Sequence, residues 1–273
     1  MTSSCAARVR TLPRLQQWDP GFGLVGDLDT SSAAPVLFLH GWMTSGAVFD
    51  DVLPMMAPAG RRLLCLDQRG AGSAAGNDGD GDSWATADYG ADVIALLDAL
   101  AIHRAVVVGH SMGGQVALWL GACHPERIAG ICAITPVPLS GLALPAEARA
   151  LFASSAGNRD TQRTILQLAT VALPTASLEH LLDAAATVST PCIVGALQGF
   201  TTGAPDVDIA RIDAPTLVVA TDDPFLPLPL LQGTVVDAIA GARLHHLPGA
   251  GHYPTAEKPS ELAAIIDAFL RSL

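Results

Sequence analysis

The stretch Ala105-Val106-Val107-Val108-Gly109-His110-Ser111-Met112-Gly113-Gly114 decides the fold of this chain. An apolar, β-branched run leads into Gly-X-Ser-X-Gly, and the segment Gln115 to Ala122 that follows has helical character, so the order is strand, sharp turn, helix. Glycines beside the serine allow a turn tight enough to present its hydroxyl at the edge of a sheet. A turn of small residues that merely contains serine is the alternative. The flanking strand and helix favour Ser111 as a nucleophile.

The composition is that of a chain able to bury a large core. Of its 273 residues, 50% are hydrophobic and 15% are charged. These values predict one large α/β domain, or a domain with an inserted subdomain, and they exclude global disorder. The formal net charge of -11 disfavours nucleic-acid binding, which requires basic patches. No apolar run approaches the length of a membrane span, so neither a nucleic acid nor a membrane is an expected partner.

Cysteine usage and the N-terminal residues bear on compartment and metal binding. The five cysteines are scattered and form no Cys-X-X-Cys pair, which predicts neither a disulfide framework nor a zinc site. No long apolar run follows the first arginines, so we expect no secretory signal and a cytoplasmic location. Residues 77–82 alternate like the start of a calcium loop, but Ser83 and Tyr89 stand where glycine and glutamate belong. We therefore expect a solvated acidic loop and no metal.

Strands and helices alternate along most of the chain. Helical spacing is found from Thr86 to Leu100 and from Ser260 to Leu270, and glycines in residues 9–28 suit an opening hairpin. Short apolar runs predict strands at 35–39, 62–66, 105–108, 128–135 and 215–220, and a last strand is expected at 242–247. This alternation predicts a mostly parallel central sheet flanked by helices.

One segment interrupts the alternation. Between residues 142 and 212, helix-like pieces rich in alanine and leucine run at 146–155, 161–172 and 177–188, with no convincing strand between them. We expect this segment, 142–212, to form a helical cap over a core made of residues 1–141 and 213–273.

A serine hydroxyl becomes a nucleophile only when a base takes its proton and an acid orients that base. His252 stands in a glycine-rich loop after the last predicted strand, a setting that suits a general base. Asp222 and Asp223 directly follow the strand at 215–220, and one of the two is expected to be a simple turn residue. We favour Asp223 over Asp222 as the acid.

An oxyanion hole requires two backbone N–H groups aimed at the developing charge. One comes from the residue after the nucleophile, Met112. The second is expected from the loop after the strand at 35–39, where Gly41 allows close approach and the N–H of Trp42 is the predicted donor.

The motifs of this chain resemble those of the α/β-hydrolase superfamily, in its single-domain form with a helical cap. They stand in the family's order: His40-Gly41-Trp42, Asp67 to Gly72, Gly109 to Gly114, His124 to Arg127, Asp223 to Pro227 and Gly251-His252. The resemblance implies the α/β-hydrolase fold. It also assigns the acid to Asp223, because the family's aspartate directly precedes such a proline. An ion pair between Asp67 and Arg69 is expected to fix the loop that holds them.

The resemblance also implies a reaction. A serine at the elbow excludes the relatives that use a carboxylate there and leaves acyl transfer, without a metal or organic cofactor, on a small or medium ester or lactone. Apolar residues near the expected mouth predict a largely apolar pocket, with Gly41, Val137, Phe225 and Tyr253 binding the substrate. Alternatives are a carbon–carbon bond hydrolase of a diketone, a cofactor-free haloperoxidase-like enzyme that makes peracids, and a non-catalytic receptor for a small ligand.

Overall fold

The sheet is parallel except at one edge. The computed structural model describes residues 15–16, 33–57, 60–75 and 83–273. Within these residues the strand order is β1-β3-β2-β4-β5-β6-β7, with only β1 antiparallel. The strands are β1 (Leu15–Gln16), β2 (Val36–Leu39), β3 (Leu63–Leu66), β4 (Ala105–His110), β5 (Ile128–Ile134), β6 (Thr216–Thr221) and β7 (Arg243–Leu247). The six predicted strands are confirmed to within two residues. Apart from β1, the expected hairpin lies outside the described residues, as does the acidic run 77–82.

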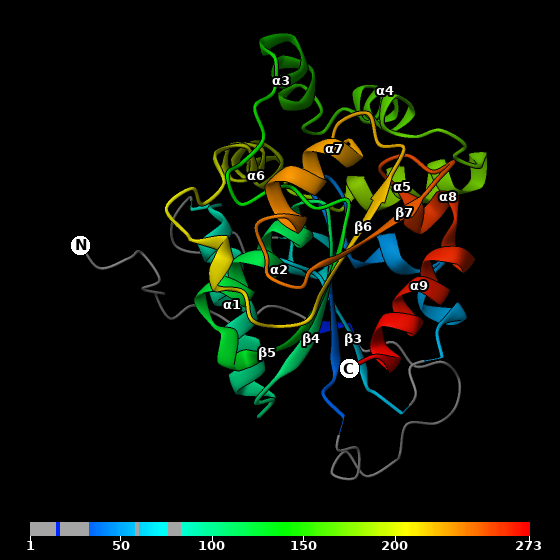
Figure 1. Ribbon diagram of the computed structural model, residues 1–273. Coiled ribbons are helices and arrows are strands. Elements are labelled where there is room, and N and C mark those ends of the chain that lie inside the picture. The colour runs from blue at the N-terminus through cyan, green and yellow to red at the C-terminus, as the bar shows by residue number, and fades with distance from the viewer. Residues whose placement is uncertain (1–14, 17–32, 58–59, 76–82) are drawn as a thin grey trace.

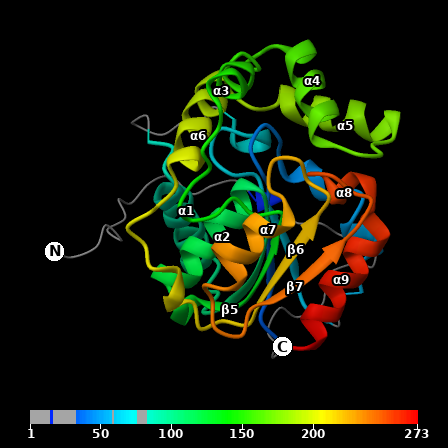
Figure 2. The ribbon, with the colours of Figure 1, turned by 45° about the horizontal axis from the view of Figure 1, so that its top comes forward.

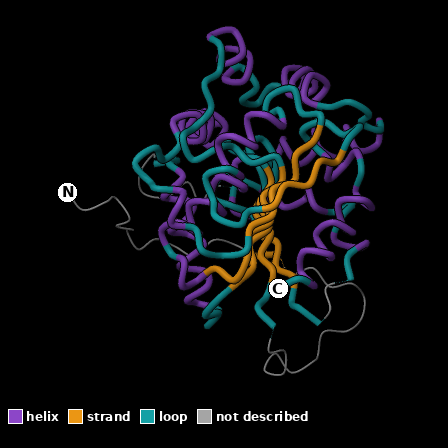
Figure 3. Tube along the Cα trace, in the orientation of Figure 1, coloured by secondary structure: helices purple, strands orange, loops and turns teal. Residues whose placement is uncertain are grey.

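Helices cover both faces of this sheet, which explains why its strands read as continuous apolar runs. Every residue of β2, β3, β4 and β6 is buried. Helices α1 (Thr86–Ala99) and α2 (Met112–Cys123) lie on one side of the strands, and α8 (Pro254–Glu257) and α9 (Pro259–Arg271) lie on the other (Figures 1 and 3).

The expected ion pair between Asp67 and Arg69 is wrong. The Arg69 guanidinium instead binds both carboxylate oxygens of Asp92 on α1, each at 2.6 Å. Asp67 accepts hydrogen bonds from the Gly46 amide and from the Ser73 amide and hydroxyl. The carboxylate therefore fixes the loop after β3 through neutral donors, while the arginine ties that loop to α1.

The segment between β5 and β6 is helical, as expected, but it holds four helices rather than three. They are α3 (Ala146–Ala153), α4 (Arg159–Ala169), α5 (Thr175–Ala186) and α6 (Thr190–Thr202), and they lie together at one end of the sheet (Figure 2). Their buried residues join the same hydrophobic core cluster as the sheet strands. The division into core and cap stays a prediction, and the packing between the two is continuous.

The remaining helical elements are short. Helix α7 (Leu228–Leu231) continues into a π-helical turn, Gln232–Val236, between β6 and β7. Short 3-10 turns occur at Gly46–Phe49, Leu53–Met55, Gly72–Ala74, Pro125–Arg127 and Ile209–Arg211. In the described part of the chain no single helix has the length and apolarity to cross a membrane. The pair α5 and α6 together meets that measure, but it is bent by 100° at its break.

Candidate active site

Ser111 occupies a strained turn between β4 and α2. Its backbone φ of 55° and ψ of -116° lie where residues other than glycine rarely occur. The chain can turn this sharply because its neighbours have no side chains. A Cβ on Gly109 would overlap the backbone of Gly113, and a Cβ on Gly113 would overlap the carbonyl of Leu39. The motif therefore places the serine where the sequence predicted, at the carboxyl end of the central strand.

His252 lies between Ser111 and Asp223 and contacts both. Its Nδ1–H donates to Asp223 Oδ2 at 2.6 Å, which leaves Nε2 as the acceptor for the Ser111 hydroxyl at 2.9 Å. Ser111 and Asp223 are buried, and the imidazole retains 12% exposure. The structure thus brings the predicted nucleophile, base and acid into one hydrogen-bonded line.

The two adjacent aspartates have different surroundings. Burial opposes ionisation of Asp223, but His252 and the backbone amides of Phe225 and Leu226 outweigh it and hold the pKa of this carboxyl below its ordinary value. Asp222 points away from this line, where its carboxylate accepts from His246 and from the Gly249 amide. Asp222 is therefore the turn residue.

The backbone of His252 is held on both sides. Its carbonyl accepts from Nε2 of His110 at 2.7 Å, and its amide donates to the carbonyl of Ala169 at the end of α4 at 2.7 Å. Burial, together with the nearby His252, lowers the pKa of His110 to about 3, so His110 remains neutral near neutral pH. A neutral His110 is a fixed hydrogen-bond donor to the loop that carries the base.

The residues predicted to supply the oxyanion donors, Trp42 and Met112, both belong to segments that meet at the serine. Met112 is the first residue of α2, where helical amides have no partner within the helix. Gly41 packs against the elbow, because a Cβ there would lie 3.1 Å from Cβ of Ser111, and Trp42 follows directly. The loop after β2 and the start of α2 thus meet at Ser111.

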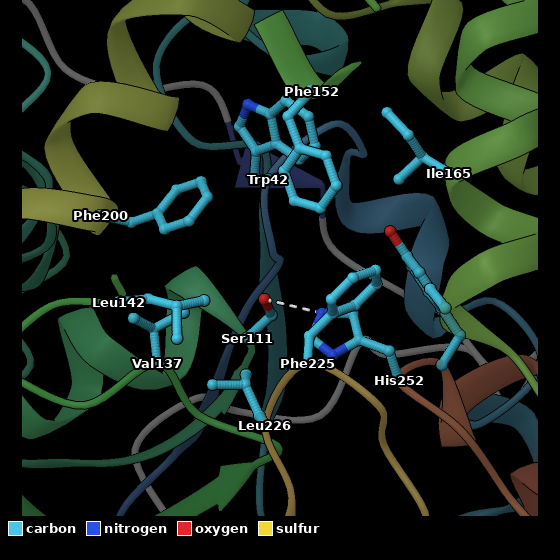
Figure 4. A pocket seen from close by; sticks show the side chains of 12 residues that line it. Trp42, Ser111, Val137, Leu142, Phe152, Ile165, Phe200, Phe225, Leu226 and His252 are labelled. Carbon is cyan, nitrogen blue, oxygen red and sulfur yellow. Dashed lines mark hydrogen bonds between the residues drawn. The ribbon is translucent and has the colours of Figure 1, made fainter. Parts of the chain in front are cut away.

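Ser111 and His252 open onto an apolar pocket of about 450 Å³, a volume that includes open solvent at its mouth. In Figure 4 Trp42 and Phe152 lie on one side of the serine–histidine pair, and Val137 and Leu226 on the other. Phe152 stacks on Trp42, with ring centroids 5.2 Å apart, and meets Phe225 edge to face. Among the described residues, the lining carries no lysine, arginine, aspartate or glutamate.

Three of the four predicted substrate-binding residues line this pocket, namely Val137, Phe225 and Tyr253. Gly41 instead supports the elbow. Further lining residues come from the segment 142–212 and were not predicted from the sequence: Leu142, Phe152, Ile165, Ala169 and Phe200. They are ordinary apolar residues of helices and loops, and nothing in their spacing separates them from core positions.

The chain is similar to several known proteins over most of its length. The model of the alpha/beta hydrolase family matches residues 36–265. The "Putative carbamate hydrolase RutD" of Variovorax paradoxus is 31% identical over 80% of this chain and 84% of its own length. The non-heme chloroperoxidase of Streptomyces lividans is 28% identical over 94% of this chain and 95% of its own. The structure of Est816, described as an N-acyl homoserine lactone degrading enzyme, aligns with a TM-score of 0.72 at 26% identity, over 88% of this chain and 94% of that one. The family match spans most of the chain, and the chain belongs to the alpha/beta hydrolase family.

Proposed function

We propose that this protein is a serine hydrolase that cleaves a small or medium, largely apolar carboxylic ester or lactone through an acyl-enzyme. The observation that carries the proposal is the line from Asp223 through His252 to Ser111, with the serine facing an apolar pocket. A base fixed in one tautomer, 2.9 Å from a hydroxyl held in a strained turn, is suited to nucleophilic catalysis.

In the proposed acylation step, Oγ of Ser111 attacks the substrate carbonyl carbon while its proton passes to Nε2 of His252. The carbonyl oxygen becomes an oxyanion that accepts hydrogen bonds from the amides of Trp42 and Met112. The bond from carbon to the leaving oxygen then breaks, and the imidazolium returns its proton to that oxygen. Asp223 stabilises the imidazolium during this step, because its lowered pKa keeps it ionised.

In the proposed deacylation step, a water molecule takes the place of the leaving alcohol. His252 removes a proton from this water as its oxygen attacks the acyl carbon, and the same oxyanion donors serve again. The bond to Oγ of Ser111 breaks, the proton returns to Oγ, and the carboxylic acid leaves. In a lactone both products are parts of one molecule, a hydroxy acid.

The pocket supports an uncharged acyl group. Its lining is aliphatic and aromatic, and an ionised group placed there would lose hydration without a counter-charge. Among the relatives, Est816 is described as degrading an N-acyl homoserine lactone, and a relative from Neisseria meningitidis is named for a methyl ester. Both are carbonyl compounds that the proposed mechanism accepts.

A substrate panel tests the proposal. Initial rates are measured with p-nitrophenyl esters of increasing acyl length, aliphatic lactones, a carbamate and a diketone, for the native chain and for Ser111→Ala. We expect esters or lactones to give the highest kcat/KM, and Ser111→Ala to lower kcat by about 10⁴-fold or more. Ester hydrolysis that survives Ser111→Ala unchanged would refute the proposal.

Two alternative activities would show in the same panel, and a third requires a separate assay. A preference for the carbamate would favour the activity in the RutD name, and a preference for the diketone would favour carbon–carbon cleavage. Peracid formation, the activity suggested by the chloroperoxidase relative, would require hydrogen peroxide to replace water in deacylation, and an acetate-dependent halogenation assay detects it.

A further inference from the structure

Glu257, five residues after His252, uses its carboxylate to join two parts of the molecule. Its Oε2 accepts from the amide of Gly251 at 2.9 Å. Its Oε1 accepts from the amides of Val171 and Ala172, at 2.7 and 2.9 Å, just beyond the end of α4. One side chain on α8 therefore holds the loop that carries the base and the segment that follows α4.

The loop also contacts the end of α4 directly. The amide of His252 donates to the carbonyl of Ala169, and a Cβ on Gly251 would overlap that same carbonyl. Ala169 and Ile165 of α4 also line the pocket. Helix α4, which forms part of the pocket wall, thus contacts the loop that carries His252 directly. Glu257 bridges the same two segments through its carboxylate.

We propose that Glu257 is a positioning residue that sets the place of His252 by anchoring α4 to the histidine loop. This inference rests on the proposed serine-hydrolase function. Hydrogen bonds from backbone amides to a charged carboxylate are among the stronger ones in proteins. Loss of this anchor lets the Gly251–His252 backbone shift against α4, and a shift of the imidazole lengthens its 2.9 Å contact to Ser111.

Glu257→Gln is the discriminating variant. It keeps the size of the side chain, but an amide presents only one acceptor oxygen, so either the Gly251 amide or the amides of Val171 and Ala172 lose their partner. Glu257→Asp keeps the charge and is shorter by about 1.5 Å, so it too fails to reach both sides. The matched control is Glu261→Gln. Glu261 is a half-exposed carboxylate on α9 that accepts a hydrogen bond from Ser260 and faces Lys258.

The experiment measures kcat, KM and the rate of inactivation by a fluorophosphonate for the native chain and the three variants, with Tm alongside. We expect Glu257→Gln to lower kcat and the inactivation rate by about tenfold, with KM changed less than twofold, because the serine is less well activated while the pocket is retained. Glu261→Gln should behave like the native chain. If Glu257→Gln does not fold, the same split in Glu257→Asp supports the inference.

The outcomes separate this inference from the proposed function. If the native chain shows no Ser111-dependent inactivation, the proposed function itself fails. If the native chain is inactivated and the Glu257 variants keep native kcat and inactivation rates, Glu257 is a structural residue only and the inference is overturned. A change confined to KM or to Tm overturns it as well.

Discussion

The adjacent residues Asp222 and Asp223 have different roles because they differ by one position after the end of β6. Both follow β6, yet only Asp223 faces His252, while Asp222 faces His246 and the Gly249 amide on the outside. Successive side chains at the end of a strand point to opposite sides, so one of two adjacent carboxylates reaches the base and the other serves the turn.

We predict that Asp223→Asn lowers kcat about 10³- to 10⁴-fold, because an amide nitrogen facing Nδ1 favours the wrong tautomer of His252. Asp222→Asn should change kcat less than about fivefold and serves as the matched control. Steady-state kinetics on one ester measures both. A larger loss of kcat in Asp222→Asn would show that the acid has been assigned to the wrong residue.

His110 couples the active site to the pH dependence of stability. Its pKa in the folded protein is about 3, below the ordinary value of 6.5, mainly because it is buried. Because folding lowers the pKa of His110, the unfolded chain binds this proton more tightly than the folded chain. The contribution of His110 to stability is therefore fully present above pH 6.5 and is lost as the pH falls from 6.5 toward 3. At pH 5 the unfolded chain has bound this proton and the folded chain has not.

We therefore expect His110 to account for a loss of about 2 kcal/mol in the free energy of unfolding between pH 8 and pH 5. His110→Gln keeps a donor for the His252 carbonyl but binds no proton, so its loss over this range should be smaller by that amount. Urea denaturation at the two pH values measures it, with the exposed His245→Gln as control. Equal losses in His110→Gln and the native chain would contradict the neutral, buried state of His110.

At the scale of elements, α6 shows how packing can replace helix propensity. Its sequence holds two glycines, Gly195 and Gly199, which disfavour a helix interior. Both face Trp84, and a Cβ at either position would overlap it. The indole of Trp42 adds a hydrogen bond to the carbonyl of Ile193 at 2.8 Å. The glycines let the helix approach the core closely enough for Phe200 to line the pocket.

This packing predicts that Gly199→Ala destabilises the protein by about 1–3 kcal/mol, although alanine is the better helix former. Gly233→Ala is the control, because a Cβ there meets no atom within 4 Å, and we expect it to be neutral or to stabilise by up to about 1 kcal/mol. Chemical denaturation measures both. Equal stability of the two variants would contradict the inference that the close contact between Gly199 and Trp84 requires glycine.

The sequence was a good guide to the sheet and to the line of Ser111, His252 and Asp223, because these depend on local signals. Buried parallel strands read as apolar runs, and the catalytic candidates stand beside glycine or proline at strand ends. The pocket wall was not predictable, because Phe152, Ile165 and Phe200 reach Ser111 only through the packing of separate helices. Glu257 was missed for the same reason, since its partners just beyond the end of α4, Val171 and Ala172, lie more than eighty residues earlier.

At the scale of the whole molecule, the helices between β5 and β6 and the sheet form one packed body around the site. The buried residues of α3 to α6 belong to the same core cluster as the strands, and the His252 amide is bound to α4. The sheet therefore positions the three candidate catalytic residues, and the helices between β5 and β6 shape the pocket. Whether this body acts as a serine hydrolase depends on the reactivity of one hydroxyl.

Covalent labelling of that hydroxyl is the most direct test. The native chain is treated with a fluorophosphonate at neutral pH, and the adduct is located by peptide mass spectrometry, with Ser111→Ala and His252→Ala alongside. We expect one adduct, on Ser111, that is absent in Ser111→Ala and forms at least a hundredfold more slowly in His252→Ala, consistent with the size of general-base effects. A folded native chain that forms no adduct on Ser111, or that labels equally fast without His252, would contradict it.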